Sequence, residues 1–148
     1  MRTIFDPAAR DALLRRIDAL EPDQPALWGR MNAPQMVCHL NCALRAALGE
    51  LEVGPPRGPL SRPPLNWVVI HLLPWPKGKA ESPPEFLATQ PAAWQEDVHT
   101  LRSLLERNAA RGPGATWPPS PVFGRISGRS WGVLHHKHVD HHLRQFGV

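Results

Sequence analysis

The chain has 148 residues, the size of one ordinary domain spanning 1–148, with a formal charge of +4 and an isoelectric point near 9.8. Its arginines are scattered among acidic residues without a basic run or interleaved aromatic platform, so nucleic-acid binding is disfavoured against a solvated basic surface. The amino-terminal stretch lacks the apolar region of a secretory signal. The longest apolar run covers nine residues, whereas a membrane span needs about 20. We therefore expect a soluble, cytoplasmic protein.

A first helix is predicted to start at Pro7. Asp6 before it is a good N-cap residue, and proline suits the first helical position because it has no N–H to leave unpaired. The apolar stripe of this helix consists of Leu13, Leu14, Ile17 and Leu20. The segment EPDQP ends it.

A second helix is predicted to begin at Asn32 and to end at Gly49. Gln35 follows the cap residue by three positions, as in a capping box, and the apolar face is formed by Met36, Leu40, Ala43 and Ala47. Cys38 and Cys42 lie four residues apart on this helix, where the rigid backbone rarely suits a disulfide. We therefore expect both thiols to be reduced.

A long proline-rich connection follows the second helix. Ten of the 18 prolines lie between Pro55 and Pro91, which excludes one continuous helix there. The run Leu65–Leu73 is predicted to form a short helix or a buried extended piece, packed into the protein. A third long helix is predicted from about Pro84 or Pro91 to Ala110, with the stripe Phe86, Leu87, Trp94, Val98, Leu101, Leu104 and Leu105.

A fourth helix, capped by Ser127, is predicted to run through Phe146. No strand pattern of alternating apolar residues persists anywhere in the chain, and no internal repeat is visible. The sequence therefore predicts an all-α fold, a four-helix bundle with a long crossover between the second and third helices.

Five of the eight histidines lie close together on this fourth helix. Since each residue advances about 100° around a helix, His138 and His142 lie roughly 40° apart and share a face with Trp131 and Leu134. That face must turn inward to bury the tryptophan and the leucine, whereas His136 points to the far side. Two imidazoles one turn apart on an inward face can chelate one metal ion, although such pairs on a surface are more often incidental.

His39 lies beside the apolar stripe of the second helix. Taken alone it is typical of a hydrogen-bonded core histidine, but with an inward pair on another helix it can complete a three-histidine metal site. Three neutral ligands leave open positions for water or substrate, which is the catalytic pattern. Cys42, about 60° from His39, could be a fourth ligand, a wall of the site or simply a small buried hydrophobic residue. His71 and His99 have no matching partners, and we expect them to be structural or exposed.

Three stretches follow one another along the chain: WGRMNAPQMVCHL, then PKGKAESPPEFL in the crossover, then PVFGRISGRSWGVLHHKHVDHHLRQF. In this order they resemble the DinB/YfiT-like metalloprotein superfamily over nearly the whole chain, and within it the DUF1569 branch. The resemblance implies a four-helix bundle with up-down-down-up topology and a divalent metal, usually zinc or nickel, held at the positions of His39, His138 and His142. Similar proteins often have a histidine before the PxFG turn, where this chain has Ser120.

Characterised relatives in this superfamily include transferases and isomerases that use low-molecular-weight thiols as cosubstrates. The resemblance therefore implies a metal-dependent enzyme of the thiol-dependent transferase or hydrolase type, acting on a small organic substrate. His135, His141 or Gln145 would then orient the activated thiol or water or carry its proton, and Trp67 and Trp75 would wall the substrate or simply pack in the core. The alternatives are a non-catalytic stress or structural protein with a structural or vestigial metal site, and a weak nucleic-acid binder. The apolar helix faces also allow a homodimer.

Overall fold

The computed structural model describes residues 1–56, 58–77, 84–87 and 89–148. Within these ranges the regular secondary structure is helical, apart from one isolated bridge between Ser120 and Gly124. The long helices are α1 (Pro7–Asp18), α2 (Ala33–Leu48), α4 (Trp94–Arg111) and α5 (Gly128–Gln145). The shorter elements are α3 (Leu65–His71) and the 3-10 turns η1 (Pro59–Ser61) and η2 (Pro84–Phe86). The predicted all-α fold is confirmed.

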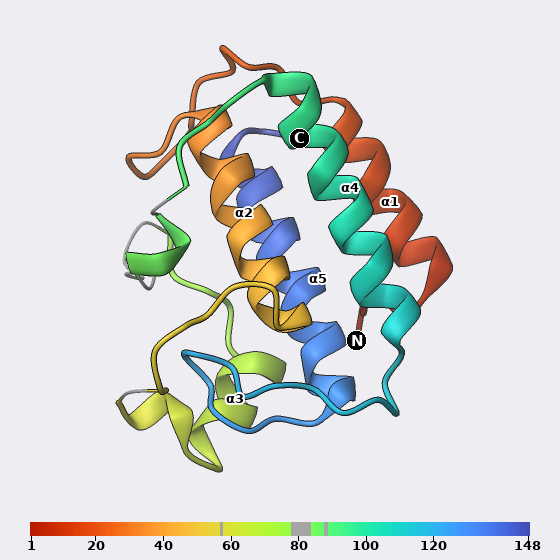
Figure 1. Ribbon diagram of the computed structural model, residues 1–148, viewed down its shortest axis with the longest axis vertical. Coiled ribbons are helices and arrows are strands. Elements are labelled where there is room, and N and C mark those ends of the chain that lie inside the picture. The colour runs from red at the N-terminus through yellow and green to blue at the C-terminus, as the bar shows by residue number, and fades with distance from the viewer. Residues whose placement is uncertain (57, 78–83, 88) are drawn as a thin grey trace.

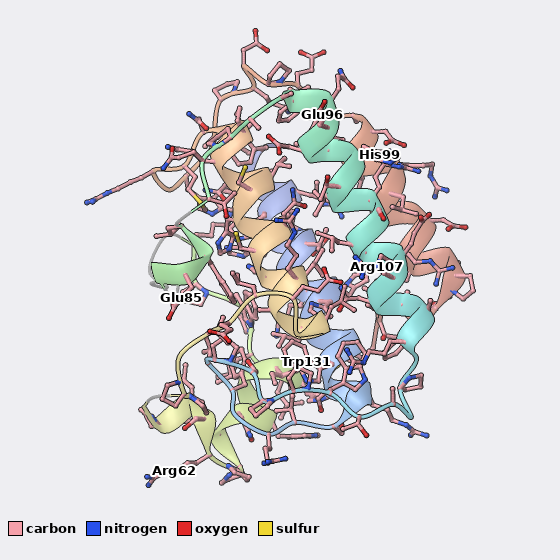
Figure 2. The ribbon with its side chains drawn as sticks, viewed as in Figure 1. Arg62, Glu85, Glu96, His99, Arg107 and Trp131 are labelled. Atoms are coloured by element: carbon pink, nitrogen blue, oxygen red, sulfur yellow. The ribbon has the colours of Figure 1, made fainter. Side chains whose placement is uncertain are left out.

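The four long helices pack around a shared apolar core (Figure 1). Both α2 and α1 lie against α4 and against α5, so the four form a closed ring of neighbours. Each helix contributes its apolar stripe to this core, which contains Leu13, Leu14 and Ile17 of α1, Met36, Val37, Leu40 and Leu44 of α2, Leu101, Leu104 and Leu105 of α4, and Val139 and Leu143 of α5. Burying one such side chain contributes about 1.5–3 kcal/mol. The helix α3 lies against α5 near Trp131, at the other end of the molecule from the C-terminus (Figures 1 and 2).

The predicted helix starts are confirmed by their hydrogen bonds. The carboxylate of Asp6 accepts a bond from the first turn of α1 at 3.0 Å. Asn32 and Gln35 form the complete capping box of α2, with bonds of 2.9 and 3.0 Å. The hydroxyl of Ser127 accepts a bond from the N–H of Ser130 at 3.1 Å, at the start of α5. These caps set where α2 and α5 begin, whereas the spacing of the apolar residues sets which side chains face the core.

The third long helix starts later than the sequence predicts. α4 begins at Trp94 rather than at Pro84 or Pro91, and the residues near Pro84 form the separate turn η2. A proline disfavours the α conformation in the residue before it, so no helix runs from Pro84 through Pro91, and the extended Ala93 is the N-cap of α4. As a result Phe86 and Leu87 do not belong to the stripe of α4: Phe86 packs against α2 and Leu87 is 52% exposed.

The prediction that the run Leu65–Leu73 packs into the protein is wrong for most of its side chains. The run forms the short helix α3, in which only Asn66 and Ile70 are buried. Four large apolar side chains of the run are between 39% and 61% exposed: Leu65, Trp67, Leu72 and Leu73. A helix of about two turns contacts the body of the protein with one side only, so its other side faces solvent. Among the helices described, none has the length and apolar character needed to cross a membrane.

Candidate metal centre

Three histidines from two helices meet where α2 lies against α5. His39 of α2 and His138 and His142 of α5 each place one ring nitrogen within 4.8 Å of the others. The Nε2 atoms of His39 and His138 are 3.0 Å apart, and the ring centroids are separated by 4.9 to 5.0 Å. The three histidines predicted from the sequence therefore form one cluster that could hold a metal ion.

The local sequence explains why the two histidines of α5 face inward. The helix runs without a break from its Ser127 cap, so His138 and His142 project one turn apart. Trp131 and Leu134 are buried on the same side, as the helical spacing predicts. His142 is also buried, whereas His138 has an intermediate exposure.

The donor set fits a divalent transition metal. Two imidazole nitrogens bound to a tetrahedral zinc ion at ~2.0–2.1 Å lie roughly 3.4 Å from each other. The 3.0 Å between the Nε2 atoms of His39 and His138 is close to that separation. The third nitrogen, of His142, lies within 4.8 Å of the other two.

Burial keeps all three imidazoles neutral, which is the form that binds metal. It lowers the pKa of His39 to about 4, with the backbone of Phe86 opposing the shift in part. Burial lowers the pKa of His142 to about 3, and the neighbouring His39 adds to the effect. The pKa of His138 is lowered well below its usual value, first by burial and then by the other imidazoles. At pH 7 each of the three rings is therefore neutral, with one nitrogen that carries a lone pair and one that carries a proton.

Gln145 fixes the orientation and the tautomer of His142. Its Oε1 atom accepts a hydrogen bond from His142 Nδ1 at 2.7 Å, and its Nε2 atom donates one to the carbonyl of Trp28 at 2.7 Å. Because a carbonyl can only accept, the amide nitrogen must face Trp28 and the amide oxygen must face His142. The proton of His142 is therefore on Nδ1, and Nε2 is left free to bind a metal.

Gly29 makes room for this amide. Its φ is +84°, and a Cβ atom placed on it would lie 2.5 Å from Nε2 of Gln145. The segment around it is tied to the end of α5, since the N–H of Leu27 donates to the carbonyl of Gln145 at 2.8 Å. A glycine at this position therefore allows the segment before α2 to approach His142 through Gln145.

Three aromatic side chains, called the aromatic wall below, lie against the cluster or against the adjacent His141: Trp28, Trp75 and Phe86. The ring centroid of Trp75 lies 5.6 Å from that of His138 and 5.9 Å from that of His141. Trp28 approaches His141 with its centroid at 5.9 Å. Trp75 therefore borders the cluster at His138, and both tryptophans contact the adjacent His141.

Phe86 closes the side of the cluster formed by α2. Its ring centroid is 5.9 Å from that of His39, and its side chain packs with the buried Cys42. The Sγ atom of Cys42 lies 3.1 Å from the hydroxyl of Thr89 and does not join the three histidine nitrogens. Cys42 therefore behaves as a small buried residue beside the site, which was the simplest of its three interpretations.

The three residues proposed to orient or protonate a ligand lie in different surroundings. His135 is fully enclosed next to Trp131, at a centroid separation of 5.0 Å, and burial lowers its pKa to about 3. Its Nε2 atom has no hydrogen-bond partner in the part of the chain that the structure describes. Gln145 uses both ends of its amide, as described above. His141 is partly exposed, and its ring centroid lies 5.4 Å from that of His142.

The other histidines lie away from the cluster. His136 is on the opposite side of α5, where it lines a surface cavity together with residues of α1. His71 contacts the hydroxyl of Ser130 at 3.0 Å, and Trp67 stacks on it at a centroid distance of 5.0 Å. Trp67 therefore belongs to α3 and its surroundings and does not wall the cluster, unlike Trp75. His99 is on the exposed side of α4 (Figure 2).

Trp28, Gly29 and Lys77 were not identified as site residues from the sequence. All three lie in loops, where no helical period indicates the direction of a side chain. The sequence did contain one indication of this part of the site: Trp28 and Gly29 are adjacent and lie shortly before the N-cap of α2. A glycine next to a large aromatic residue at a helix entry is consistent with a close backbone approach.

Comparisons of the chain with family models, with curated protein sequences and with solved structures gave no match. The resemblance to the DinB/YfiT-like superfamily therefore stays a prediction from the sequence motifs. What the site can do follows from its own residues, which are three neutral imidazoles, one orienting amide and an aromatic wall.

Proposed function

We propose that the protein is a divalent-metal-dependent enzyme of the thiol-dependent transferase or hydrolase type, with zinc or nickel held by His39, His138 and His142. The observation that carries this proposal is the fixed tautomer of His142. Gln145 holds the proton of that ring on Nδ1, so its Nε2 atom has a lone pair for the space shared with the other two imidazoles. A buried lone pair of this kind is unfavourable without a cation or a donor beside it.

The number of protein ligands in the cluster favours a catalytic role over a structural one. Structural zinc sites are closed by four protein ligands, whereas catalytic sites use three and keep a position open. Cys42, the fourth ligand that the sequence suggested, contacts Thr89 instead, and His138 is partly exposed beside Trp75. A divalent ion held by these three histidines would lower the pKa of a thiol or a water molecule and so would supply a nucleophile near neutral pH.

The side chains around the cluster have separate tasks in this proposal. Gln145 holds the ring of His142 in the orientation needed for binding, and the aromatic wall limits access of water. His141 takes up the proton that the thiol or water releases, because it is the one candidate of the three that is both partly exposed and adjacent to the cluster. Burial lowers the pKa of His141 and Asp140 opposes the shift in part, so the ring is neutral at pH 7 and able to accept a proton.

We also propose that the chain has the fold of the DinB/YfiT-like family. The ring of contacts among α1, α2, α4 and α5, with a long connection between α2 and α4, supports an up-down-down-up four-helix bundle of the DinB/YfiT-like kind. In such bundles, metal sites are built in the core from side chains on facing helices, which is where these three histidines lie.

Elemental analysis of freshly purified protein tests the metal site. We expect about one divalent ion per chain in the wild type, as a mononuclear three-histidine site requires. The ion should be absent from the His138→Ala and His142→Ala variants. His136→Ala is the matched control, because this histidine is on the same helix but faces α1, and it should retain the ion. Loss of the ion from the His136 variant with retention in the His138 variant would contradict the assignment.

Ligand exchange separates the catalytic from the non-catalytic alternative. The cobalt(II)-loaded protein should change its visible absorption reversibly when a small thiol is added, while the protein stays folded. Unfolding on chelation, with no thiol-dependent change in the spectrum, would favour a structural ion. Tight binding of DNA that persists at physiological salt would favour the nucleic-acid alternative over both.

A further inference from the structure

The cluster has no negative charge of its own to offset that of a bound ion. Three neutral imidazoles leave the full charge of a divalent cation uncompensated. Asp140 is the acidic residue of α5 in the same part of the helix, but its two carboxylate oxygens contact Arg16 at 2.6 Å and Arg144 at 3.0 Å. The remaining charge therefore has to be balanced by the molecule that binds.

A second positive charge lies at the edge of the aromatic wall. The ammonium group of Lys77 lies 4.5 Å from the ring centroid of Trp28, and that centroid lies 5.9 Å from the ring centroid of His141. Lys77 is exposed and forms no ion pair with any residue in the described ranges of the chain. An ammonium in this position is available to a ligand that reaches the cluster past Trp28.

Two buried hydrogen-bond donors are found in the same wall. The indole Nε1 atoms of Trp28 and Trp75 are shielded from solvent and have no acceptor among the residues that the structure describes. Leaving such a donor unpaired costs about 1–3 kcal/mol, so these N–H groups favour a ligand that brings acceptor oxygens. A carboxylate offers several acceptor sites on two oxygens, whereas a neutral hydroxyl offers fewer and no charge.

We propose that the ligand of this site is a small thiol that carries a carboxylate, with its sulfur at the three histidines and its carboxylate on the side of Lys77, Trp28 and Trp75. This inference rests on the proposed function, because it names the class of thiol that the proposed metal site uses. One lysine and two neutral donors match a single negative charge. A phosphate dianion or a nucleic-acid backbone is matched by clusters of arginine and lysine instead.

Two thiols of the same length test this inference on the cobalt(II)-loaded protein. Mercaptoacetate carries a carboxylate and mercaptoethanol a hydroxyl, and the dissociation constant of each is measured from the visible spectrum of cobalt. The ratio of the two constants is compared between the wild type and Lys77→Gln, so differences in thiol acidity cancel. The control is Arg129→Gln, which removes one exposed positive charge near the start of α5, roughly 20 Å along the helix from His142.

We expect the preference for mercaptoacetate to fall about two- to fivefold in Lys77→Gln, to stay unchanged in Arg129→Gln, and to weaken as salt is added. If both thiols bind and the ratio is the same in the Lys77 variant as in the wild type, the inference is wrong while the proposed function stands. If neither thiol changes the spectrum of the folded, cobalt-loaded protein, the proposed function is wrong and the inference with it.

Discussion

Replacing Gln145 by leucine is the sharpest test of the proposed site. The change keeps a side chain of similar size but removes both hydrogen bonds, to His142 and to the Trp28 carbonyl. Gln145 is 3% exposed, so water cannot easily replace it, and each group left unpaired costs about 1–3 kcal/mol of folding stability. Residues that orient a metal-binding histidine typically change metal affinity about 10- to 100-fold when they are lost.

Competition with a chromophoric chelator measures the zinc affinity, and urea unfolding of the metal-free protein measures the stability. Gln145→Glu keeps an acceptor for His142 Nδ1 but loses the donor to Trp28, so it should recover metal affinity while staying less stable than the wild type. Gln95→Leu, on the exposed surface of α4, should change neither quantity. A Gln145→Leu protein that folds and binds zinc as tightly as the wild type would refute this reasoning.

The metal-free protein should lose stability as the pH falls below about 6.5, where unfolded imidazoles titrate, because folding lowers the pKa of His39 to about 4 and that of His142 to about 3. The unfolded chain then binds more protons than the folded one, so each ring removes about 1.4 kcal/mol per pH unit until its folded pKa is reached. Urea unfolding at about pH 7.5 and about pH 5 should show a smaller loss for His39→Gln than for the wild type, and equal losses would contradict this prediction. Gly29→Ala should weaken zinc binding in the same way as Gln145→Leu, because the new Cβ would lie 2.5 Å from the amide of Gln145. Gly114→Ala meets no atom within 4 Å and should bind zinc normally, so equal affinities in the two alanine variants would show that the Gly29 contact is unimportant.

The helices and the inward face of α5 could be predicted from the sequence because their causes are local. The capping box of Asn32 and Gln35 and the cap at Ser127 involve residues within one turn, so the pattern is visible in the sequence. The pairing of His138 and His142 follows from the helical period alone. The sequence could suggest His39 as their partner only through its place in an apolar stripe. Whether His39 contacts α5 depends on how the helices pack.

Local sequence determined which segments are helical and which of their faces are buried, while the tertiary structure decided what completes the site. The bond between Gln145 and Trp28 joins positions 117 residues apart, and no periodicity connects them. The place of Lys77 over the ring of Trp28 likewise depends on two loops meeting. The exposure of α3 also depends on the tertiary structure, because an apolar run is buried only where other elements cover it.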